Sequence, residues 1–100
     1  MGLCIIGAKD VEMYKKRGGL LVDIRSPQDY RNGHINGAVN VPVEQLENYM
    51  KTASKNQIYI FYCQHGSQSF QEGKKYVRTG YQICTLAGGF RAYRQAFGIR

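Results

Sequence analysis

Short apolar runs alternate with stretches of helical periodicity along the whole chain. The apolar runs cover residues 3–6, 20–24, 38–41, 58–62 and 83–86, and the helical stretches cover residues 8–17, 43–53, 69–80 and 90–97. Near-continuous apolar runs of four or five residues are typical of strands buried on both faces of a parallel sheet. The alternation therefore predicts an α/β fold, in which helices cover both faces of a mostly parallel sheet.

One stretch, residues 58–72, combines a buried strand, a short loop and the start of a helix. The loop begins at Cys63 and is rich in Gly, Ser and Gln, and the spacing of Ser69 and Glu72 predicts a capping box at the helix start. Such a loop gathers backbone N–H groups at the positive end of the helix dipole, where they would stabilise a thiolate. Cys63 is thus a candidate nucleophile, and a buried inert thiol is the alternative.

Three loops follow the ends of predicted strands, and in a parallel sheet these ends meet at one edge. Asp23 and Arg25 lie in the first loop, Cys63 opens the second, and residues 87–89 form the third. We expect Asp23 and Arg25 to form an ion pair that supports the site, with Asp29 as a second possible partner of Arg25. Of the two histidines, His34 is expected to be structural and His65 to be an exposed loop residue.

The length of 100 residues predicts a single domain, residues 1–100. No apolar run is as long as a membrane span, and no signal-peptide pattern is present, so no membrane partner is expected. The three cysteines are widely spaced and form no zinc ligand set, so neither a metal nor another cofactor is expected. Reduced thiols of this kind favour a cytoplasmic location.

The charge is unevenly distributed between the two halves. Residues 1–50 hold six Lys and Arg against six Asp and Glu, whereas residues 51–100 hold eight against one, so the second half carries the whole net charge of +7. A solvated basic surface explains this, and so does the steering of a small anion or an acidic partner to the Cys63 loop. Nucleic acid is not expected as a partner, because no recognition motif is present.

Two longer segments carry a family resemblance. Residues 21–30 read LVDIRSPQDY and residues 33–42 read GHINGAVNVP, and later come Tyr62-Cys63 with Gly66 and Ser69, then LAGGFRAY over residues 86–93. These segments resemble the signature of rhodanese domains, in the same order and over nearly the whole chain. The resemblance implies a rhodanese-like α/β fold with a five-stranded parallel sheet. It also implies that the Cys63 thiolate accepts a sulfane sulfur and becomes a persulfide.

The resemblance implies substrates and site residues as well. The donor would be thiosulfate or another persulfide, including a protein persulfide, and the acceptor would be cyanide or a thiol. The loop that holds the persulfide would consist of Gln64, His65, Gly66, Ser67, Gln68 and Ser69. Covalent catalysis of this type divides sulfur transfer into two displacement steps.

The chain differs from active thiosulfate sulfurtransferases at two positions, where Gln64 and Gln68 replace basic residues that are common in the family. An amide in place of a cation loses about 1.5–3 kcal/mol per charge-assisted hydrogen bond, or roughly ten- to a hundredfold in affinity. Weak turnover of thiosulfate and a donor of lower charge are therefore expected. Arg91 and Lys74 are candidates to compensate.

Three alternatives follow from these departures and from the other cysteines. The first is a catalytically weak rhodanese-fold module that binds a partner or carries sulfur. The second is phosphatase or arsenate-reductase chemistry, which is disfavoured because Ser69 stands where an Arg would clamp the oxyanion. The third concerns Cys4 and Cys84, which are interpreted as core residues, with a disulfide to Cys63 as an alternative that requires them within thiol reach.

Overall fold

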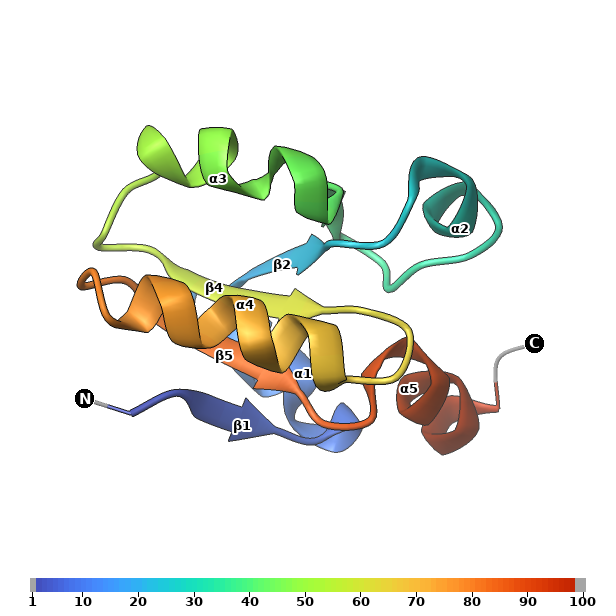
Figure 1. The fold of residues 1–100 in the computed structure, drawn as a ribbon. Helices are drawn as coiled ribbons and strands as arrows, with labels where there is room; N and C mark the ends of the chain where they lie inside the picture. The colour runs from blue at the N-terminus through green and yellow to red at the C-terminus, as the bar shows by residue number, and fades with distance from the viewer. Residues whose placement is uncertain (1, 99–100) are drawn as a thin grey trace.

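The computed structural model describes residues 2–98 and has a five-stranded parallel sheet with helices on both faces (Figure 1). The strand order is β1-β5-β4-β2-β3. The strands are β1 (Cys4–Ile6), β2 (Leu20–Asp23), β3 (Val39–Asn40), β4 (Ile58–Tyr62) and β5 (Gln82–Leu86). The helices are the 3-10 turn η1 (Ala8–Asp10), α1 (Val11–Lys16), α2 (Pro27–Arg31), α3 (Val43–Lys51), α4 (Ser67–Val77) and α5 (Gly89–Phe97). The predicted fold class is confirmed.

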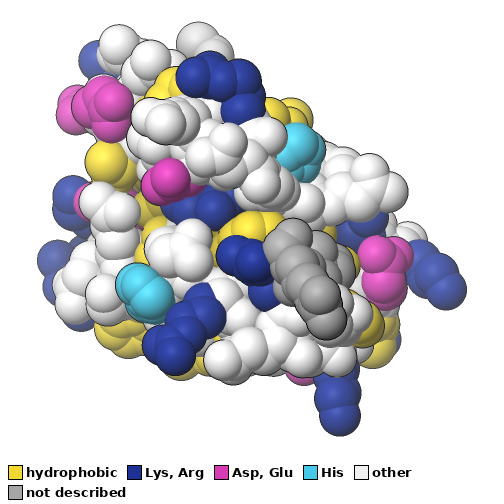
Figure 2. Space-filling model, turned by 90° about the vertical axis from the view of Figure 1, so that its right-hand side faces the viewer, with side chains coloured by type: hydrophobic (Ala, Val, Ile, Leu, Met, Phe, Trp, Pro, Cys, Tyr) yellow, Lys and Arg dark blue, Asp and Glu magenta, His cyan; other side chains and the backbone are white. Residues whose placement is uncertain are grey.

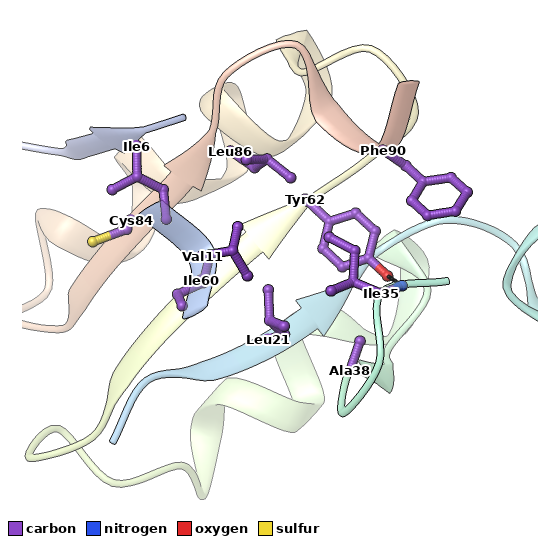
Figure 3. Packing of buried hydrophobic residues seen from close by; sticks show 10 residues of the cluster. All are labelled: Ile6, Val11, Leu21, Ile35, Ala38, Ile60, Tyr62, Cys84, Leu86 and Phe90. Atoms are coloured by element: carbon purple, nitrogen blue, oxygen red, sulfur yellow. Dashed lines mark hydrogen bonds between the residues drawn. The ribbon is translucent and has the colours of Figure 1, made fainter. Parts of the chain in front are cut away.

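The central strand β4 pairs with β2 on one side and β5 on the other, and its last four residues are buried. Its side chains alternate between two apolar clusters. Ile60 and Tyr62 belong to the cluster shown in Figure 3, whereas Phe61 and Cys63 belong to the cluster on the opposite face. A strand that is buried on both faces has no polar face, which explains the continuous apolar run in its sequence.

The two faces are covered by different helices. α3 and α4 cover one face, and Leu46, Met50 and Tyr76 pack against its cluster. α1 and α5 cover the other face, to which they contribute Val11 and Phe90 (Figures 1 and 3). In Figure 1 the labelled strands β1, β2, β4 and β5 point the same way, and β3 pairs with β2 in parallel, so the carboxyl ends of the strands lie at one edge of the sheet.

Element boundaries follow local chemistry. α2 begins as predicted, because Ser26 Oγ accepts a hydrogen bond of 3.2 Å from the Asp29 N–H and Pro27 occupies the first turn. The helix expected over residues 8–17 is divided into η1 and α1. At the start of η1, the Asp10 carboxylate accepts a hydrogen bond of 3.1 Å from the Gly7 N–H.

Within residues 2–98, no helix has the length and apolar character needed to cross a bilayer.

Candidate active site

Cys63 lies directly after β4, at the carboxyl edge of the sheet, and only 4% of it is exposed. Its sulfur accepts two backbone hydrogen bonds, from the Gly66 N–H at 3.1 Å and from the Ser69 N–H at 3.4 Å. Amide donors that point at one sulfur stabilise negative charge on it, and the dipole of α4 acts in the same direction. The geometry therefore suits a thiolate or a persulfide anion.

The start of α4 differs from the prediction. The helix begins at Ser67, and its N-cap is Gly66, which has a φ of 105°. The predicted capping box of Ser69 and Glu72 is wrong: Ser69 is fully buried, and its hydroxyl donates to the Gly66 carbonyl at 3.2 Å and lies 2.7 Å from Thr85 Oγ1. The left-handed conformation of Gly66 turns the chain early, and the sulfur of Cys63 then accepts from the free Ser69 N–H.

The loop is also held by the chain that follows β5. The Phe90 N–H donates to the Cys63 carbonyl at 2.9 Å, and the Arg91 N–H donates to the Gln64 carbonyl at 3.0 Å. This approach requires glycine at position 89, because a Cβ there would lie 2.6 Å from both carbonyl oxygens. The expected convergence of the three strand-end loops is thus observed.

Asp23 and Arg25 form the expected ion pair beside the Cys63 loop. The Asp23 carboxylate is fully buried and lies 2.7 Å from Arg25 Nη2, and it also accepts from Arg25 Nε at 3.0 Å. Burial by itself lowers the pKa of Arg25, but the hydrogen bonds and the charge of Asp23 outweigh it and raise the pKa above its ordinary value. Arg25 also stacks on the Phe90 ring, at 4.4 Å from its centre. Arg25 is therefore charged and rigidly held.

The remaining contacts of Arg25 show which groups it binds directly. Its Nη1 donates to the side-chain oxygen of Gln64 at 3.1 Å, and its Nη2 donates to the Gly33 carbonyl at 2.7 Å. Asp29, the second possible partner of Arg25, forms no direct ion pair among the described residues, although its charge also helps to raise the pKa of Arg25. It lines a cavity of about 310 Å³ that Arg25, Gln64 and Phe90 also line. The contact with Gln64 was not expected from the sequence, because Gln64 is 39 residues from Arg25 along the chain. The fold brings the two side chains together.

The other predicted loop residues take different positions. Ser67 and Gln68 are exposed in the first turn of α4, and His65 is exposed before it, as expected. The two candidate compensating cations also differ from each other. Arg91 is exposed and its backbone contacts the loop, whereas the Lys74 ammonium lies 5.0 Å from the centre of the Phe70 ring, further along α4.

His34 has the structural role that was expected of it. Its ring stacks on Tyr30, with the ring centres 3.7 Å apart, and its Nδ1 lies 2.7 Å from the Tyr30 carbonyl oxygen. Within residues 2–98, no cluster of three potential metal ligands is present.

The other cysteines do not reach Cys63. Cys84 pairs in register with Ile60, three residues before Cys63, and the two cysteines belong to clusters on opposite faces of the sheet. In Figure 3, Cys84 and Phe90 lie at opposite ends of one cluster. The alternative of a disulfide between Cys63 and Cys84 is therefore wrong for this fold, and Cys4, which is further along the sheet, is excluded in the same way.

One contributor to the site was not recognised in the sequence: Thr85 places a buried hydroxyl against Ser69. The convergence of residues 87–89 with the Cys63 loop was expected, but not the two backbone hydrogen bonds from residues 90 and 91 that hold the loop. A signal for Thr85 was available, because it is a polar residue inside an apolar strand.

Figure 2 views the edge of the sheet where the strands end. Exposed Lys and Arg side chains are spread over this face, and acidic side chains are sparser there.

With this geometry established, comparison with known proteins identifies the family. A model of the rhodanese-like domain matches residues 8–96. The chain belongs to the rhodanese-like domain family. It is 30% identical over 84 residues to the thiosulfate sulfurtransferase GlpE of Coxiella burnetii, a match that covers 83% of this chain and 78% of the relative.

Solved structures show the same fold. A rhodanese-related protein from Thermoplasma volcanium superposes with a TM-score of 0.85 at 24% identity, over 93% of this chain and 92% of that chain. The reduced CoADR-RHD protein of Bacillus anthracis has a TM-score of 0.88 at 22% identity, over 98% of this chain but only 18% of that chain. The same fold is thus also found within a much longer protein.

Proposed function

We propose that the protein is a sulfurtransferase in which Cys63 carries a sulfane sulfur between a donor and an acceptor. The observation that supports this most directly is the pair of backbone N–H groups, of Gly66 and Ser69, that point at the Cys63 sulfur. Each hydrogen bond to a charged sulfur contributes about 1.5–3 kcal/mol. The thiosulfate sulfurtransferase relatives support the same reaction class.

The reaction has two displacement steps. The Cys63 thiolate attacks the outer sulfur of thiosulfate, the sulfur–sulfur bond of the donor breaks, and sulfite leaves with the electron pair. A cyanide ion or a thiolate acceptor then attacks the terminal sulfur of the persulfide, and the Cys63 thiolate leaves. Cys63 carries one negative charge both as a thiolate and as a persulfide anion, so the same two N–H groups can stabilise both forms.

The side chains around the sulfur favour a donor of lower charge than thiosulfate. Gln64 and Gln68 are neutral, and the oxygen of Gln64 is occupied by Arg25, whose own charge is balanced by Asp23. Thiosulfate is a dianion and lacks a charged contact from either glutamine, so we expect it to be a poor donor compared with a persulfide on a small molecule or a protein. Reduced thiols suit a reducing compartment, and we place the activity in the cytoplasm.

The two glutamines also favour a second candidate function, a rhodanese-fold module that binds a partner or carries sulfur with little turnover. Both functions are consistent with the Gly66 and Ser69 N–H groups that point at the Cys63 sulfur. Only the first requires the persulfide to form and to lose its sulfur rapidly. Phosphatase chemistry has less support, because the Ser69 side chain at the relevant position is turned into the protein core.

The test is to treat the reduced protein with thiosulfate or a small-molecule persulfide, remove the excess, and measure intact mass with peptide mapping. The proposal predicts one added sulfur atom on Cys63, removable by cyanide, and no such adduct on the Cys63→Ser variant. If Cys63 stays unmodified with both donors, the sulfurtransferase proposal is wrong and the binding module is favoured. Modification by the persulfide alone assigns a donor of lower charge.

A further inference from the structure

Cys4 and Cys84 form a pair of thiols on the side of the sheet that the Cys63 mechanism does not use. They are directly opposite each other in register on the adjacent parallel strands β1 and β5. Both pack in the cluster that faces α1 and α5, so their side chains lie on the same face of the sheet. Both are free thiols in this structure.

The spacing of these strands suits a disulfide. Neighbouring strands lie ~4.8 Å apart, and disulfides form between Cα atoms that are about 4.4–6.8 Å apart. Register partners on one face also have Cβ atoms that point in the same direction. Their Cβ atoms are therefore also ~4.8 Å apart, slightly more than the roughly 3.5–4.5 Å that a disulfide spans, so a bond between Cys4 and Cys84 requires β1 and β5 to approach by only a few tenths of an ångström. A bond from either residue to Cys63 requires the sheet to break.

The pair is accessible from the edge of the sheet opposite to the Cys63 loop. A cavity of about 170 Å³ opens at the amino ends of β1, β4 and β5, and Cys4, Cys84 and Tyr14 line it. Cys4 is only partly buried, and its thiol donates to the Tyr14 hydroxyl at 3.7 Å. A small reagent can thus reach Cys4 without passing the Cys63 loop.

The two thiols differ in their reactivity. Burial raises the pKa of Cys84 to about 12, and the neighbouring Cys4 thiol adds to the rise. Because the thiolate is the reacting form, Cys84 is a poor first nucleophile at neutral pH. Cys4 is therefore the residue that reacts first, and Cys84 is the residue that resolves the product.

We propose that Cys4 and Cys84 are a second, redox-active dithiol site, which a low-molecular-weight disulfide converts to an intramolecular disulfide bond between β1 and β5. The Cys4 thiolate attacks one sulfur of the reagent and displaces one thiolate. The Cys84 thiolate then attacks the Cys4 sulfur of the mixed disulfide and displaces the second thiolate. The two cysteines lose two electrons and two protons, and the reagent gains the electrons as two thiols. This site is independent of sulfur transfer at Cys63.

The experiment uses the Cys63→Ser variant, so that the catalytic thiol does not interfere. The folded, reduced protein is incubated with 2-hydroxyethyl disulfide and then alkylated, digested with trypsin and mapped. The proposal predicts an intact mass lower by two hydrogen atoms, and a linked pair of tryptic peptides that cover residues 1–9 and 79–91. The rate of ring closure should rise as the pH is raised above neutral, because burial raises the pKa of Cys84 and leaves little of it as thiolate at pH 7.

Two further variants serve as controls. Adding Cys84→Ala to Cys63→Ser should stop the reaction at a mixed disulfide on Cys4, and adding Cys4→Ser should leave Cys84 unmodified in the folded protein. Oxidised protein should also unfold at a higher urea concentration than reduced protein, because the bond closes a long loop. Persistent mixed disulfide on Cys4 with Cys84 present, or dimers linked through Cys4, would overturn the proposal.

Discussion

Arg25 Nη1 donates a hydrogen bond of 3.1 Å to the side-chain oxygen of Gln64, and this contact joins the end of β2 to the Cys63 loop. The other nitrogens of the same guanidinium are held by the fully buried Asp23 carboxylate and by the Gly33 carbonyl. Gln64 therefore does not offer its oxygen to a substrate. It is part of the support of the loop, and the charge at the site depends on other residues.

Replacing Arg25 should destabilise the protein strongly. Arg25→Ala leaves the Asp23 carboxylate buried without its ionic partner, at a cost of about 3–5 kcal/mol in the free energy of unfolding. Urea denaturation measures this cost. The double variant Asp23→Asn/Arg25→Gln is the control, because it removes both charges and should lose less stability than Arg25→Ala. A single variant as stable as the double one would show that the ion pair does not support the fold.

Gln68 offers a test of how the donor is recognised. Gln68→Arg places a guanidinium in the first turn of α4, close to the two amide donors, and should raise kcat/KM for thiosulfate roughly ten- to a hundredfold. The matched control is Gln71→Arg, which adds the same charge at another exposed position of the same helix. An equal gain in both variants would mean that general charge, and not a contact at position 68, limits thiosulfate use.

Gly89 should be essential to the shape of the Cys63 loop. In Gly89→Ala the new Cβ would lie 2.6 Å from the carbonyl oxygens of Cys63 and Gln64, so the loop must shift. A displacement of about 1 Å at a reacting group lowers the rate roughly 100-fold. Single-turnover transfer from Cys63 persulfide to cyanide measures this effect.

Gly98→Ala is the control for backbone strain alone. Gly98 has a φ of 68°, close to the 63° of Gly89, but a Cβ there meets no atom within 4 Å. It should cost about 1–2 kcal/mol of stability and leave the transfer rate unchanged. Similar rates in the two variants would show that the contact of Gly89 with the loop is unimportant.

Cys84 should make the protein less stable at alkaline pH. Its pKa is raised to about 12 in the folded protein, mainly by burial, against about 8.5 in the unfolded chain. The stabilisation is fully present below pH ~8.5 and is lost as the pH rises toward 12, because the unfolded chain loses the proton first. Urea denaturation of reduced protein between about pH 8 and pH 9 measures the slope below the usual range of tyrosine ionisation.

The control for this slope is Cys84→Ala, which keeps the other titratable groups. The fall in the free energy of unfolding over this pH range should be smaller in the variant than in the natural protein. Parallel curves would contradict a raised pKa for Cys84. Buried tyrosines such as Tyr62, whose pKa is also raised mainly by burial, add a further loss of stability above this range in both proteins.

The fold could be predicted because its signals are local. The run Ile58–Tyr62 is apolar throughout, and the cap at Ser26 and the glycines at 88–89 mark the ends of elements within a few residues. The parallel orientation of the strands follows from the alternation of strand and helix along the chain. The position of Cys63 at the carboxyl edge follows from the same reasoning.

The details of the site depend on contacts between distant segments. The pattern Ser69 and Glu72 is identical to that of a capping box, but Thr85 on another strand pairs with the Ser69 hydroxyl and Gly66 becomes the cap. Likewise, Asp29 is near Arg25 in sequence, but the loop from β4 brings Gln64 to the guanidinium. Local patterns cannot distinguish these outcomes, because tertiary contacts decide which donor meets which acceptor.

Discharge of the isolated intermediate decides whether Cys63 itself carries the sulfur. The protein is loaded with a sulfane sulfur donor, freed of the donor by gel filtration, and mixed with cyanide, after which thiocyanate is measured. We expect one thiocyanate per loaded Cys63 and a return to the reduced mass, with none from Cys63→Ser. Thiocyanate that forms only while donor and acceptor are present together, or equally from Cys63→Ser, would contradict a covalent sulfur carrier at Cys63.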